Sequence, residues 1–109
     1  MVIGFFTIEL HLPGMRSLKG KRQVIQSLKA RFRSRYNVAV SEPNEHGNLW
    51  QRASLAVVSI ADRREALEQL FESVRRDTET QIPGHVVDAS AEYLEPADGG
   101  PRGWTQGWE

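Results

Sequence analysis

The sequence predicts an α+β fold in which two helices lie on one face of a four-stranded antiparallel sheet. Three observations lead to this expectation. Stretches of alternating apolar residues occur four times, stretches with a helical apolar stripe occur twice, and their order is strand–helix–strand–strand–helix–strand. This order, with short turns between the remaining elements, is that of the split β–α–β sandwich called the ferredoxin-like fold.

The first half of the chain begins with a strand over 2–12, which alternates and ends at the turn dipeptide Pro13-Gly14. Ser17 is a favourable N-cap for a helix. Apolar residues then recur at helical spacing: Leu18, Ile25, Leu28, Phe32 and Tyr36. Residues 37–41 predict a short second strand.

The second half begins with a long strand over 49–61, and we expect it to pair with the first strand at the centre of the sheet. Asp62 and Glu65 have the spacing of a capping box, with Asp62 as N-cap of a helix that runs to about Asp77. Residues 86–94 predict the last strand. We expect residues 1–95 to form one domain, and the Gly-, Pro- and Trp-containing residues 96–109 to form a loosely ordered tail.

Composition excludes several classes of protein. The 109 residues include no cysteine, so disulfides, a thiol nucleophile and cysteine-bound metal are excluded. No stretch approaches the roughly 20 apolar residues of a membrane span. His11, His46 and His85 lack the spacing of metal ligands, so we expect neither a metal nor a cofactor.

The distribution of charge is the strongest functional signal. The net charge is zero, yet residues 10–41 carry eight Lys and Arg and no acidic residue, while residues 62–109 carry eleven acids and five bases. On the first predicted helix, four cations recur at steps that keep them on one side, and Arg16 precedes them: Lys19, Arg22, Lys29 and Arg33. This pattern favours contact with RNA phosphates. The alternative is a solvated surface, or pairing with Glu65, Glu68 and Glu72 of the second helix.

Two further surfaces are candidates for binding. The turn before the first helix has the parts of an anion site, namely Gly14, Arg16, Ser17 and Lys19, but no phosphate-binding loop motif. The open face of the sheet would expose Phe5, Trp50 and Arg52. We expect that face to form a homodimer or to be covered by Trp104 and Trp108 of the tail, in preference to stacking on RNA bases.

The opening strand with its ELHLPG end, the run RSLKGKRQVIQSLKARFRSRYNVAV and the strand LWQRASLAVV together resemble the YlxP-like family, domain of unknown function 503. The resemblance covers about residues 2–95. It implies a ferredoxin-like fold in a cytoplasmic bacterial protein with no established enzyme activity. It also implies a ribosomal or RNA context, because genes of this family often neighbour genes for translation initiation and ribosome maturation. Gly20 departs from the family, which commonly has a glutamate there to complete a capping box.

An enzymatic hypothesis rests on two residues. Small acylphosphate hydrolases share this topology and use an arginine of the loop before the first helix with an asparagine on a nearby strand. Arg16 and Asn37 echo that pair, although the motif itself is absent. We therefore expect no catalytic residues and a non-enzymatic binding module, with a dimeric interaction protein and a small phosphate-handling enzyme as alternatives.

Overall fold

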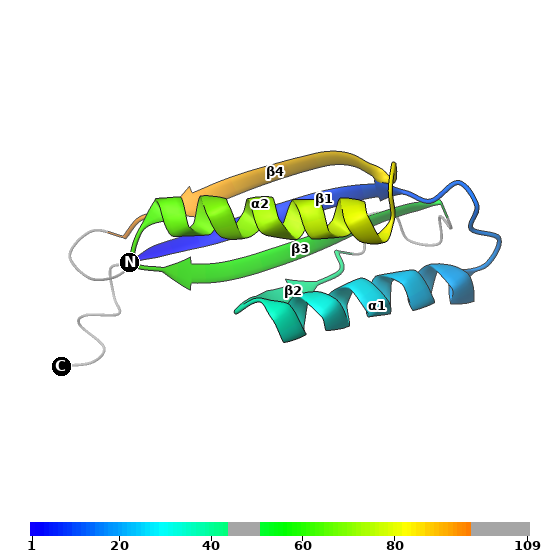
Figure 1. The fold of residues 1–109 in the computed structure, drawn as a ribbon, viewed down its shortest axis with the longest axis horizontal. Coiled ribbons are helices and arrows are strands. Elements are labelled where there is room, and N and C mark those ends of the chain that lie inside the picture. The colour runs from blue at the N-terminus through cyan, green and yellow to red at the C-terminus, as the bar shows by residue number, and fades with distance from the viewer. Residues whose placement is uncertain (44–50, 97–109) are drawn as a thin grey trace.

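The computed structural model describes residues 1–43 and 51–96. The elements follow the order β1 (Val2–His11), α1 (Leu18–Arg35), β2 (Ala39–Ser41), β3 (Arg52–Ala61), α2 (Arg64–Gln81) and β4 (Val86–Leu94). The four strands form one antiparallel sheet in the order β2-β3-β1-β4, and both helices lie on the same face of it (Figure 1). The predicted ferredoxin-like fold, with the two longest strands at the centre, is confirmed.

The core lies between the helices and the sheet. On β1 the alternating residues Val2, Phe6, Ile8 and Leu10 are buried, as the period of two predicts. They meet side chains of β3 and of both helices, among them Leu55, Val57, Ile25, Phe32, Leu67 and Phe71. Neither helix of the described chain is long and apolar enough to cross a bilayer.

Helix α2 packs closely on β1 through aromatic side chains. The rings of Phe6 and Phe71 stack with their centroids 5.0 Å apart. Gly4 makes room for this contact, because a Cβ on Gly4 would lie 2.7 Å from the Phe71 ring. The ring of Tyr93 in β4 also lies beside Phe71, at 6.1 Å between centroids. The sequence pattern of β1 did not identify Gly4 as a packing position.

The prediction of a capping box before α2 is wrong. The N-cap is Arg63, in extended backbone, and no side chain accepts a hydrogen bond from the first turn. Asp62 lies one residue too early to do so. The helix also continues past Asp77 to Gln81, because Asp77 and Thr78 are buried within its apolar side and keep it packed on the rest of the molecule.

Several sequence-based predictions lie outside the described residues. These concern Trp50 on the open sheet, His46 in the preceding turn, the first residues of the strand predicted from residue 49, and the tail with Trp104 and Trp108.

Candidate nucleic-acid interface

Helix α1 begins at a side-chain cap, as predicted. The Ser17 hydroxyl accepts a hydrogen bond from the backbone N–H of Gly20, at 3.1 Å. The backbone carbonyl of Ser17 accepts the N–H of Lys21, at 3.2 Å. The predicted anion-site residues Gly14, Arg16, Ser17 and Lys19 are all exposed around this start. The Ser17 hydroxyl already serves the helix, however, so it is not aimed at a ligand.

The side of α1 that faces the sheet contains one basic residue among apolar ones. The buried residues of the helix are Lys21, Ile25, Leu28 and Phe32, which follow helical spacing. Lys21 is only 5% exposed. Lys21 therefore belongs to the inner side of the helix and not to its exposed surface.

The side of α1 that faces α2 meets a single buried carboxylate, that of Asp77. Arg31 Nε lies 2.6 Å from one oxygen of Asp77, and Arg35 Nε lies 3.8 Å from the other. The Tyr36 hydroxyl donates to the same carboxylate at 3.2 Å. Partial burial, and next the negative charge of Asp77, raise the pKa of Tyr36 above its usual value. Two arginines of α1 and its C-cap tyrosine thus converge on one acid of α2.

The acids that were expected to pair with α1 are used within α2 or remain exposed. Glu72 binds Arg75 at 2.8 Å and Arg76 at 3.1 Å, and the hydrogen bond from Arg75 lowers the pKa of Glu72. Glu68 lies 3.8 Å from Arg64. Glu65 is exposed in the first turn of α2. The alternative that Lys19, Arg22, Lys29 and Arg33 pair with these acids is therefore wrong. The two helices do pair, but through Arg31, Arg35 and Asp77.

The remaining cations of α1 lie on the side away from α2. Each residue turns an α-helix by about 100°, so with Ile25 facing the core, Arg31 and Arg35 lie about 80–120° round toward α2. By the same geometry the four other cations lie about 40–120° round the opposite way, and we call them the basic ridge: Lys19, Arg22, Lys29 and Arg33. One contact confirms this placement, because an Arg33 guanidinium N–H donates to the backbone carbonyl of Val40 in β2, at 3.1 Å.

None of the acidic residues in 1–43 and 51–96 forms an ion pair with the basic ridge. Lys29 is half-buried and the other three residues are exposed. The carboxylate of Asp77 is paired with Arg31 and Arg35 on the other side of α1. The ridge therefore presents about four positive charges over about 21 Å of helix, at 1.5 Å per residue.

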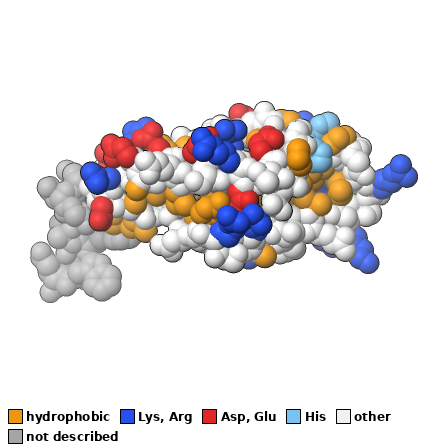
Figure 2. Space-filling model, viewed as in Figure 1, with side chains coloured by type: hydrophobic (Ala, Val, Ile, Leu, Met, Phe, Trp, Pro, Cys, Tyr) orange, Lys and Arg blue, Asp and Glu red, His pale blue; other side chains and the backbone are white. Residues whose placement is uncertain are grey.

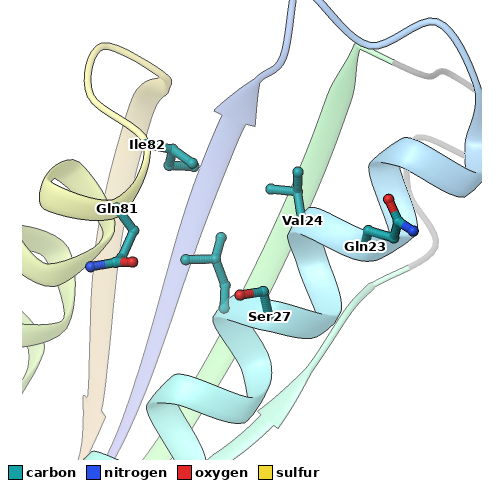
Figure 3. A pocket seen from close by; sticks show the side chains of 6 residues that line it. Gln23, Val24, Ser27, Gln81 and Ile82 are labelled. Atoms are coloured by element: carbon teal, nitrogen blue, oxygen red, sulfur yellow. The ribbon is translucent and has the colours of Figure 1, made fainter.

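The start of α1 projects beyond the end of α2, as the arrangement of the two helices in Figure 1 shows. Figure 2 shows acidic and basic side chains side by side over α2, while basic side chains project at the right-hand end, where α1 begins, with no acidic side chain beside them. An open groove of about 270 Å³ separates the two helices near this end, and Figure 3 shows its lining: Gln23, Val24, Ser27, Leu28, Gln81 and Ile82. None of these residues is charged, so the groove adds no counter-charge to the ridge.

The open face of the sheet lies on the opposite side of the molecule from the helices. Phe5 is 43% exposed there, and Arg52 is exposed opposite His11. Ser54 is buried despite facing this side, and its hydroxyl donates to the Glu9 carboxylate at 2.6 Å. Phe5 and Arg52 therefore share this face as predicted, with Arg52 paired to His11, six residue positions along β1 from Phe5.

The two residues of the enzymatic hypothesis do not share a site. Arg16 precedes α1 and Asn37 follows it, so the whole 18-residue helix, about 27 Å long, separates them.

Two of the three histidines lie close together in the structure. The backbone N–H of His11 donates to the backbone carbonyl of His85 at 2.8 Å. Within 1–43 and 51–96, no three His, Asp or Glu residues gather as metal ligands would.

Comparison with known proteins agrees with the resemblance seen in the sequence. Residues 3–91 match the family described as a protein of unknown function, DUF503. The chain belongs to this family. One relative is the uncharacterized protein YlxP of Bacillus subtilis (strain 168), which is 30% identical over 73 residues, covering 67% of this chain and 78% of that protein. Neither description states a function.

Solved structures with the same fold are distant in sequence. The de novo designed protein Foldit4 is 14% identical with a TM-score of 0.52, and the match covers 87% of this chain and 97% of that one. An uncharacterized NIPSNAP domain protein from Burkholderia xenovorans is 12% identical with a TM-score of 0.51, over 93% and 99% of the two chains. At these identities the likeness shows the fold alone.

The sequence identified the basic ridge but missed the residue that separates it from the other cations. Asp77 was taken as the end of the second helix. Its position was available as a signal, since it follows Leu67, Leu70, Phe71 and Val74 at helical spacing and so falls on the apolar side. A carboxylate on that side requires a buried partner, which an arginine of α1 could have supplied.

Proposed function

We propose that this protein is a non-enzymatic module that binds RNA through the basic ridge of α1. The single observation that carries the proposal is the division of charge on this helix. Arg31 and Arg35 have a carboxylate partner, whereas Lys19, Arg22, Lys29 and Arg33 have none among the described residues.

Phosphate groups would relieve the repulsion within the ridge. Like charges three or four residues apart on a helix destabilise it by a few tenths of a kcal/mol per pair. A row of phosphates would replace these repulsions with attractions and release counterions, which drives association at low salt. Such contacts fix the position of a backbone and carry no sequence information, so we expect binding that discriminates weakly between RNA sequences.

A ribosomal partner in the cytoplasm is the narrower form of this proposal. It rests on the resemblance to the YlxP-like family, because genes of that family often lie beside genes for translation initiation and ribosome maturation. The absence of cysteine is compatible with a reducing compartment. Purified ribosomal subunits and ribosomal RNA are therefore the first probes to use.

The test compares two triple variants with equal net charge. Lys19→Gln/Arg22→Gln/Lys29→Gln removes three ridge cations and leaves Arg33 with its carbonyl contact. Arg63→Gln/Arg64→Gln/Arg76→Gln removes three exposed cations from α2 and its N-cap. We expect the ridge variant to bind ribosomal RNA at least about tenfold more weakly, and the control variant to bind within about twofold of wild type.

Equal losses in the two variants would assign the binding to net charge alone and would contradict a specific role for α1. A pull-down from lysate gives a second readout. Captured material that is unaffected by nuclease would also argue against RNA as the partner.

A second candidate function is self-association through the open sheet. The observation that favours it is the exposure of large apolar side chains there, with Phe5 at 43%, Ile60 at 53% and Leu94 at 56%. Contiguous apolar surface of this kind commonly marks an interface. The two functions are compatible, because α1 and the open sheet lie on opposite sides of the molecule.

A further inference from the structure

The strand register arranges the open face of the sheet in rows, because residues paired across antiparallel strands point to the same side. Two rows at one end are apolar apart from Glu92: Leu94–Ile3–Ile60 and Glu92–Phe5–Val58–Ala39. A neutral row follows: Ser90–Thr7–Ala56–Ser41. Two rows at the other end hold the remaining charges: Asp88–Glu9–Ser54 and His11–Arg52. The face therefore has an apolar end and a charged end.

The apolar end continues around the edge of the sheet. An open groove of about 490 Å³ at the β2 edge is lined by Ile3, Asn37, Val38, Ala39, Val58, Ser59 and Ile60. Phe5 of β1 is exposed, and it is paired with Val58 of β3, which lines this groove. The apolar surface is thus continuous from Leu94 on β4 to Val38 before β2.

The size of the face decides how much of it a partner must use. Three strands of about 10 residues and the three residues of β2, at 3.3 Å per residue and 4.8 Å between strands, give a flat area of about 510 Å². A stable interface removes about 800 Å² from each partner. A second copy would have to cover nearly the whole face, including its charged end, so the charges must also match.

Two symmetric arrangements would place one sheet on another, and the rows distinguish them. A two-fold axis across the strands would lay the second row on the fourth row of the other copy. Phe5 would then meet Glu9, and Glu92 would meet Asp88, which places an apolar ring on a carboxylate and like charges together. This arrangement is disfavoured.

A two-fold axis along the strands, between β1 and β3, lays each row on itself with the strands exchanged. Phe5 of one copy then faces Val58 of the other, and Ile3 faces Ile60. The acids of β1 and β4 face the half of the other sheet that holds Arg52 and no described acid in its rows. Apolar surface meets apolar surface, and opposite charges are brought within reach.

We infer that two copies of this chain pack open face to open face about a two-fold axis that runs along the strands. This inference rests on self-association as the second candidate function and adds its geometry. The aligned packing is that of β-sandwiches, in which sheets lie about 10 Å apart. Each copy keeps its basic ridge exposed, because α1 lies on the other side of each sheet.

The first part of the test measures the oligomeric state of the full chain by sedimentation equilibrium. We expect a dimer that Phe5→Asp weakens at least about tenfold, since an exposed aromatic ring at the interface is replaced by a charge. Ala66→Asp on the exposed side of α2 adds the same charge elsewhere and should leave the dimer intact. A monomeric wild type would overturn both the self-association and its geometry. If the wild type is a monomer and Trp104→Ala/Trp108→Ala is a dimer, the tail and not a second copy is the occupant of this face.

The second part tests the axis alone, using single cysteines in a chain that has none. Ser41→Cys on β2 and Ser90→Cys on β4 are conservative changes at exposed positions of the neutral row. With a bismaleimide linker of about 10 Å, matching the separation of packed sheets, we expect cross-links when the two variants are mixed and few in either alone. Efficient cross-linking of Ser90→Cys to itself would indicate the axis across the strands. That result would overturn this geometry while leaving self-association in place.

Discussion

The two helices of this protein have the same length, 18 residues, but they treat their charges in opposite ways. Helix α2 carries five acids and three bases, and it pairs Glu68 with Arg64 and Glu72 with Arg75 and Arg76. Helix α1 carries seven bases and no acid, so it must find counter-charge elsewhere. Asp77 of α2 supplies one carboxylate to α1, on one side only.

This difference teaches that charge on a helix has to be judged by side and not by total. The cations of α1 toward α2 are part of the fold, as Arg31 shows by its contact with a buried acid. The cations away from α2 contribute little to the fold, apart from the carbonyl contact of Arg33. The function proposed above therefore rests on the ridge and not on the helix as a whole.

The sharpest way to break the contrast is to remove the acid that joins the helices. Asp77→Ala should lower the free energy of unfolding by about 2–3 kcal/mol, because it leaves Arg31 partly buried without its acceptor. Urea unfolding measures this change. Glu68→Gln, which removes an exposed acid of the same helix, should cost less than about 0.5 kcal/mol. Equal costs for the two variants would show that Asp77 does not hold the helices together.

A second variant tests the close packing of α2 against β1. Gly4→Ala should destabilise the protein by about 2 kcal/mol, since the new methyl group would meet the Phe71 ring at 2.7 Å. Gly14→Ala is the matched control, because no atom lies within 4 Å of its added Cβ. Thermal and urea unfolding of both variants should separate them clearly. A neutral Gly4→Ala would mean that α2 can move away from β1 without loss.

A smaller effect compares how the two helices begin. Ser17→Ala should cost about 1 kcal/mol, because it removes the hydroxyl that accepts the Gly20 N–H. Asp62→Ala should be close to neutral, since Asp62 makes no capping bond to α2. Urea unfolding again gives both values. A larger loss for Asp62→Ala than for Ser17→Ala would contradict the observed caps.

Local patterns in the sequence predicted most of the fold, because strands and helices are set by periodicity. The alternation in β1 and β3 identified both central strands, and Ser17 identified the start of α1. The N-cap of α2 was mispredicted as Asp62, one residue before the observed Arg63. A shift of one residue at a helix start does not change the hydrophobic pattern from which the helix is predicted. The packing role of Gly4 could not be assigned from local patterns, since it depends on Phe71, far away in the chain. Local spacing places Asp77 on the apolar side of α2, but not its partner Arg31.

The candidate site shows the same limit. The sequence predicted that Lys19, Arg22, Lys29 and Arg33 share one side of a helix, which follows from spacing. Which cations a neighbouring helix neutralises depends on how the two helices pack, and spacing within one helix does not contain that information. Lys21 is different, because it lies four residues before Ile25 and its place on the inner side follows from spacing within α1.

The most direct test of the central claim is the salt dependence of binding to ribosomal RNA. For wild type we expect log K to fall linearly with log salt concentration, with a slope that reflects the phosphates contacted. Lys19→Gln/Arg22→Gln/Lys29→Gln should reduce the magnitude of this slope by about 2–3, or about one per lost contact, while Arg63→Gln/Arg64→Gln/Arg76→Gln leaves it unchanged. The same slope in all three proteins would contradict RNA binding through the basic ridge.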